Sequence, residues 1–66
     1  SAYTDADALN YLVHAEEVRD GLMMHPDTRR ELLYVLTMLR DRGEKETFRF
    51  LREVVLAGKP FAVPAQ

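Results

Sequence analysis

Imidazole and thiolate ligands for a metal ion are few in this sequence of 66 residues. His14 and Glu17 stand three positions apart, a spacing that brings both side chains to one face of a helix. Zinc sites use three or four ligands, yet His25 is the only other imidazole and cysteine is absent. We therefore expect His14 and Glu17 to form a surface pair without a metal ion, and we expect no cofactor.

Hydroxyl groups are the remaining candidates for covalent chemistry. A hydroxyl nucleophile needs a neighbouring base that activates it. Apart from the terminal Ser1, the hydroxyls belong to the tyrosines and four threonines, and none of them stands in a recognisable catalytic motif. The sequence therefore predicts a protein that is not an enzyme.

A stripe of mainly basic residues is the clearest candidate for a charged docking face. Its members recur at intervals of four, three and four residues, and they are Lys45, Arg49, Arg52 and Leu56. A helix would place them on one side, where they could meet an acidic peptide or a nucleic-acid backbone. The alternative is a solvated face that is balanced by Glu46 and Glu53 or by an acidic first helix.

The charge balance argues against nucleic acid as the partner. The net charge is −2 and the isoelectric point is about 5.6, so most of the surface would repel phosphates. The charge is unevenly spread, because residues 1–28 carry six acidic side chains against one arginine, whereas residues 29–66 carry eight basic against five acidic. The two halves can attract each other within one chain or between two copies.

The first of three amphipathic segments is expected to form a helix over about residues 5–22. Thr4, followed three residues later by Asp7, resembles a capping box, which predicts that the helix begins there. The sequence allows two positions for the end of this helix. Gly21 could supply a left-handed cap, or the helix could continue to Met24 and stop before Pro26.

The second segment predicts a helix over about residues 28–42. Pro26 cannot lie in a helix interior, and Thr28 with Glu31 matches the capping pattern S/T-x-x-E. Gly43 is suited to end this helix in a left-handed conformation. The apolar residues of this segment would cover a broad part of the helix surface, broader than a helix needs when it covers a core on one side only. We therefore expect this helix to be central.

The third segment predicts a helix over about residues 45–57 that stops at Gly58, followed by an extended tail over residues 58–66. Phe61 and Val63 in this tail either pack back on the helices or contact a partner. The whole chain should form one all-α domain, a small three-helix up-down-up bundle with an extended C-terminal tail.

Two segments resemble the first two helices of a paired amphipathic helix (PAH) domain, with which transcriptional corepressors grip an amphipathic helix of a partner. They are DALNYL at residues 7–12 and, after a proline, LLYVLTML at residues 32–39. The family's groove lies between these helices, so the resemblance implies transcription regulation and a partner-binding site. This site would consist of Ala8, Tyr11, Leu12, Ala15, Leu33 and Leu36, with Met38 as a further candidate.

The chain departs from the PAH pattern in two places, which puts the complete PAH fold in doubt. The link between the two helices is longer here, and the tail KPFAVPAQ is too short and rich in proline for the fourth helix of that family. A second resemblance covers LLYVLTMLRDRGEKETFRFLREV, which is similar to a helix pair of caspase-recruitment (CARD) domains, although those domains have six helices. Both families are interaction modules.

Large apolar side chains occur in all three segments and in the tail, and three short helices cannot easily cover them all. We therefore expect a non-catalytic protein–protein interaction module that binds a partner helix or peptide in an apolar groove between helices. The alternative is a homodimerisation module whose helices complete a shared core, and a third possibility is regulatory nucleic-acid binding through the basic stripe.

The sequence also allows a prediction of where in the cell the protein is located. No apolar run approaches the roughly 20 residues that cross a bilayer, and the N-terminus lacks the basic and hydrophobic segments of a secretory signal. The absence of cysteine permits a reducing compartment. We expect no membrane association and an intracellular location, either cytoplasmic or nuclear.

Overall fold

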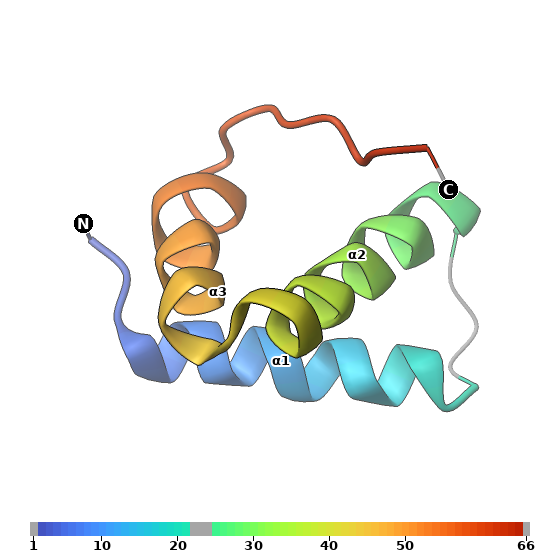
Figure 1. Cartoon of the computed structure of the whole chain (residues 1–66), viewed down its shortest axis with the longest axis horizontal. Coiled ribbons are helices and arrows are strands. Elements are labelled where there is room, and N and C mark those ends of the chain that lie inside the picture. The colour runs from blue at the N-terminus through green and yellow to red at the C-terminus, as the bar shows by residue number, and fades with distance from the viewer. Residues whose placement is uncertain (1, 22–24, 66) are drawn as a thin grey trace.

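The computed structural model describes residues 2–21 and 25–65, and within them the chain forms helices and no strands. The elements are α1 (Asp5–Arg19), α2 (Pro26–Arg42), α3 (Glu44–Phe50) and η1 (Leu51–Val55), a π-helical turn that continues α3. Figure 1 shows α2 returning above α1, α3 and η1 standing over the N-terminal part of α1, and the tail passing back toward the start of α2. The predicted fold class, a three-helix all-α bundle with an extended C-terminal tail, is confirmed.

The predicted capping box begins α1. The Thr4 hydroxyl oxygen accepts from the Asp7 backbone amide at 3.2 Å, and the Asp7 carboxylate accepts from the Thr4 backbone amide at 2.8 Å. The helix ends at Arg19, three residues before the expected boundary, because Gly21 takes a φ of +124° that no helix continues through. Gly21 therefore provides the earlier of the two proposed stops, and Met24 lies outside the described residues.

The start of α2 corrects one expectation. His25 is the N-cap in place of Thr28, and its Nδ1 accepts from the Asp27 backbone amide at 3.2 Å. Pro26 occupies the first helical position, where its fixed φ suits the helix and its missing N–H is no loss. The helix therefore begins at the proline, two residues earlier than expected.

Gly43 alone joins α2 to α3. Its φ of +88° and ψ of 174° end α2, as expected, and the next residue already starts α3. The Gly43 amide donates to the Leu39 carbonyl at 3.1 Å, and the Gly43 carbonyl accepts from the Thr47 hydroxyl at 2.7 Å. This one-residue turn directs α3 back over α1.

The third helix widens before it ends. In η1 the Leu56 amide donates to the Leu51 carbonyl five residues earlier, at 2.8 Å. The Lys59 amide then donates to the Val54 carbonyl at 2.9 Å while Gly58 adopts a φ of +72°, which is a Schellman arrangement. The predicted stop at Gly58 is confirmed, and the regular helical turns end at Val55.

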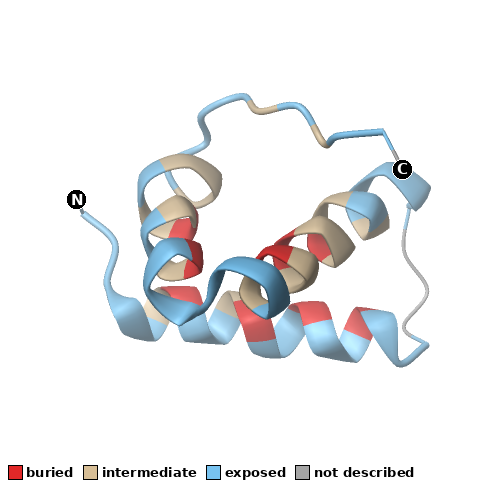
Figure 2. Cartoon of the chain, viewed as in Figure 1, coloured by how far each residue is buried: buried red, intermediate tan, exposed pale blue. Residues whose placement is uncertain are grey.

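The core lies where the three helices face one another, as the buried positions in Figure 2 show. One cluster joins α1 to α2 and η1 and consists of Ala8, Leu12, Val35 and Leu51. A second lies toward the other end of α1 and consists of Ala15, Val18 and Leu32. Small alanines on α1 leave room for the larger side chains of α2, so the two helices pack closely.

The tail packs back on the bundle. The ring of Phe61 lies 6.4 Å from that of Tyr34 and 5.2 Å from that of Phe50, and the latter two rings are 6.3 Å apart. Edge-to-face and stacked pairs at these separations are favourable. Of the two alternatives for Phe61, the structure shows the packed one.

Candidate functional site

Four residues of the groove that the PAH resemblance implies are buried inside the chain. Their exposed fractions range from 0% to 4%, and they are Ala8, Leu12, Ala15 and Met38. They contribute to the core that holds the helices together, so they present almost no surface to a partner in this conformation. The other three groove residues, Tyr11, Leu33 and Leu36, are half-buried and keep part of their surface.

A small apolar hollow opens on the surface where α1, α2 and α3 meet. Its volume is about 150 Å³, and it is lined by Leu9, Leu12, Val13, Glu16, Leu39, Glu44 and Phe48. Leu9 is 53% exposed and Val13 is 48% exposed, one helical turn apart on α1. Two large apolar side chains therefore stand beside the hollow with half of their surface in water.

The hollow continues along the boundary between α1 and α2. A second depression of about 400 Å³ shares Glu16 and Leu39 with it and adds Leu33 and Leu36. We call the combined surface the apolar face, and its large side chains are Leu9, Val13, Leu33, Leu36, Leu39 and Phe48. Two of the predicted groove residues, Leu33 and Leu36, belong to it.

The charged side chains that line the apolar face differ between its two parts: glutamates line the hollow, whereas Arg19 and Arg40 line the second depression together with Glu16. Glu16 and Glu44 line the hollow, and neither forms an ion pair within the described part of the chain. The nearby Arg40 donates to Asp41 at 2.8 Å, which lowers the pKa of Asp41 and leaves that pair neutral. Arg19 is likewise paired with its neighbour Asp20, at 3.3 Å. Neither arginine neutralises the two glutamates.

Tyr11 lies between the two core clusters and packs against both. Burial, and to a smaller extent the Glu31 carboxylate, raise the pKa of Tyr11 from 10.0 to about 12. A neutral phenol that is held this way acts as a structural contact between α1 and α2. This gives Tyr11 a role inside the bundle besides its place in the implied groove.

The basic stripe is largely paired within the chain. Arg49 contacts Glu53 at 3.2 Å, and Arg52 forms a salt bridge with Asp5 of α1. Lys45 is exposed and has no ion-pair partner among residues 2–21 and 25–65, and Leu56 is half-buried. Two of the three cations thus already have carboxylate partners, and docking at this stripe stays a prediction.

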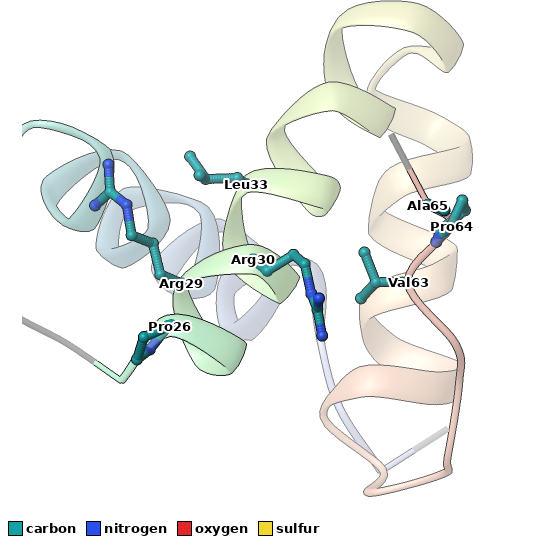
Figure 3. Close-up of a pocket in the computed structure, with 7 residues that line it drawn as sticks. All are labelled: Pro26, Arg29, Arg30, Leu33, Val63, Pro64 and Ala65. Atoms are coloured by element: carbon teal, nitrogen blue, oxygen red, sulfur yellow. The ribbon is translucent and has the colours of Figure 1, made fainter.

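The two arginines that line the depression under the tail do not point toward a common site. It has a volume of about 510 Å³ and includes Arg29, Arg30 and Leu33 of α2 and Val63 of the tail. Figure 3 shows Arg30 extending toward Val63 while Arg29 points the other way. Arg29 donates to the Val18 carbonyl at 2.5 Å, and Arg30 contacts Asp27 at 3.3 Å. Both guanidinium groups are therefore used by the chain itself.

The histidines and the glutamate considered as metal ligands do not come together with further ligands in the described part of the chain. His14 and Glu17 are exposed on α1, and His25 caps α2. Over the described ranges there is no group of three or more side chains that could hold a metal ion. Within the same ranges, no helix combines the length and the apolar character that crossing a membrane requires.

Sequence reasoning missed several residues of the apolar face: Leu9, Val13, Leu39, Phe48 and the two rim glutamates. A signal for part of this surface was present, because Leu9 and Val13 are four residues apart and adjoin the core stripe of α1. Comparisons of the chain with protein-family models, curated proteins and solved structures give no significant match. The function is therefore inferred from the surface of the chain itself.

Proposed function

We propose that this chain is a non-catalytic protein–protein interaction module that binds a partner helix or peptide on the apolar face. The observation that carries the proposal is the exposure of Leu9 and Val13, at 53% and 48%, beside a hollow that Leu39 and Phe48 line. Covering the exposed half of each of these two side chains would contribute about 1 kcal/mol. Exposed apolar surface next to a concavity is typical of an interaction site.

A helix suits the shape of the apolar face. The face runs from Leu33 and Leu36, at the boundary between α1 and α2, to the hollow that Phe48 of α3 lines. An amphipathic helix presents apolar anchors along one side at intervals of three and four residues. Such anchors could contact Leu33 and Leu36 at one end and the hollow at the other.

The test is a titration with synthetic amphipathic helices that share one leucine stripe and differ in the charge of the flanking positions. We expect at least one peptide to shift the methyl NMR signals of Leu9, Val13 and Leu39. The double variant Leu9→Ser/Val13→Ser should weaken binding about tenfold or more, because it removes the exposed apolar surface. Val54→Ser, a half-buried position outside the apolar face, is the matched control and should bind normally. If no peptide of the series shifts these methyl signals, the proposed function is wrong.

A second copy of the chain is the alternative occupant of this face. The unequal charges favour it, because residues 1–28 carry six acidic side chains against one basic and residues 29–66 carry eight basic against five acidic. Sedimentation at several concentrations distinguishes the two. A dimer that Leu9→Asp converts to a monomer would support self-association, whereas a monomer at all concentrations would exclude it.

A further inference from the structure

The hollow of the apolar face has an acidic rim, Glu16 and Glu44, whereas Arg19 and Arg40 at the second depression are each paired with the adjacent aspartate. The acidic rim of the hollow indicates the chemistry of the partner. We propose that the face binds a basic amphipathic helix, one whose apolar stripe is flanked by lysine or arginine. The inference rests on the proposed function and specifies the partner that this face would select. Glu16 of α1 and Glu44 of α3 carry it, because both line the hollow next to Leu9 and Val13.

The absence of intramolecular partners sets these two glutamates apart from most other carboxylates of the described chain. Six carboxylates form ion pairs with arginines, namely those of Asp5, Asp20, Asp27, Asp41, Glu46 and Glu53. Glu16 and Glu44 have no such cation in the described ranges, and the arginines near the face are already engaged. A bound helix could therefore supply cations without breaking an existing ion pair.

The position of the glutamates makes their charge effective. They stand on different helices at the margin of an apolar surface, where a bound partner would exclude part of the water. Ion pairs at such a margin are stronger than fully solvated pairs, and they raise the association rate and select the partner's charge. An acidic helix would instead meet two uncompensated like charges.

Glu44 also stabilises its own helix, and the test must separate this effect from recognition of the partner's charge. It lies in the first turn of α3, where a negative charge stabilises the helix dipole. Glu16 lies near the C-terminal end of α1, where a negative charge gains no stabilisation from the helix dipole. The effect of Glu16→Gln is therefore the cleaner measure of charge recognition, and Glu44→Gln should be interpreted together with its unfolding free energy.

The experiment uses three synthetic peptides of about 18 residues, or five helical turns, with an identical leucine stripe and with lysine, glutamine or glutamate at the flanking positions. Affinities are measured by fluorescence anisotropy at about 50 mM and about 300 mM salt. We expect the lysine peptide to bind about tenfold more tightly than the glutamate peptide at low salt, and this preference should shrink at high salt.

Three variants test the residues that carry the preference. Glu16→Gln and Glu44→Gln should each lower affinity for the lysine peptide by about threefold to fivefold and leave the glutamine peptide unaffected. Glu53→Gln makes the same change in net charge outside the apolar face, where Glu53 contacts Arg49 at 3.2 Å. It should leave the affinities unchanged, which controls for the overall charge of the chain.

Each outcome decides between the two proposals. Equal binding of all three peptides, or equal loss with Glu16→Gln and Glu53→Gln, would overturn the basic partner while the interaction module stands. Failure of every peptide to bind would overturn both proposals. A stable homodimer that Leu9→Asp dissociates would show that a second copy occupies the face and would also overturn the inference.

Discussion

At the scale of single residues, Tyr11 shows how a predicted contact residue serves the interior. Its ring packs against both core clusters, and burial with the Glu31 charge raises the pKa of its phenol to about 12. In the unfolded chain the same phenol titrates near 10. The difference links the stability of the fold to pH.

The first prediction concerns this linkage. The folded pKa lies above the unfolded one, so the stabilising contribution is complete below about pH 10 and is lost as the pH rises toward 12. With allowance for solvent screening at a half-exposed group, we expect about 1 kcal/mol of unfolding free energy to disappear over this range. Tyr11→Phe should remove that part of the pH dependence, which denaturant unfolding between pH 9 and about 12 would measure. A parallel loss in both proteins would contradict the assignment, because the two proteins differ only in the phenol of Tyr11.

At the scale of elements, glycine determines where the helices end. Gly21, Gly43 and Gly58 all have positive φ values, and each follows a helical segment. Gly43 has the most demanding role, since one residue both ends α2 and begins α3. The angle between these helices, and with it the position of Phe48 beside the hollow, depends on this residue.

The second prediction tests Gly43. An added Cβ would meet no atom within 4 Å, so any cost of a side chain comes from the backbone conformation alone. Gly43→Ala should lower the unfolding free energy by about 1–3 kcal/mol, because L residues rarely adopt a φ of +88° with a ψ of 174°. A chain made by chemical synthesis with D-alanine at position 43 should be at least as stable as the natural one, since D residues favour positive φ. Equal stability of the two alanine isomers would refute this explanation.

At the scale of the whole molecule, the tail is part of the fold. Phe61 joins the rings of Tyr34 and Phe50 and so connects α2, α3 and the C-terminal segment. The three rings do not line the apolar face, and Leu33 is the residue of that face that also lines the depression under the tail.

The third prediction concerns the tail. Phe61→Ala should lower the unfolding free energy by about 1–2 kcal/mol, less than for a fully buried ring because Phe61 is half-buried. It should also change the Tyr34 NMR signals by removing the ring-current contribution of Phe61, while that of Phe50 remains. Pro64→Ala, at an exposed position of the same tail, is the control and should change neither. Unchanged stability together with unchanged Tyr34 signals in Phe61→Ala would show that the aromatic contact does not form.

Several local features of this protein follow from short stretches of its sequence. The capping box of Thr4 and Asp7 and the stops at Gly43 and Gly58 depend on neighbouring residues only, so their chemistry could be read directly. The start of α2 was misjudged because two capping signals compete within a few residues, and the proline with His25 prevailed over Thr28.

The packing of the three helices against one another determines which apolar residues are exposed. The core stripe of α1 includes Ala8 and Leu12, and Leu9 and Val13 form a second apolar stripe beside it. Periodicity shows which residues share a side of a helix, but the packing of α2 and α3 selects the side that is buried. Here they cover the first stripe and leave the second in water beside Glu16 and Glu44, because a single helix cannot specify where its neighbours will pack.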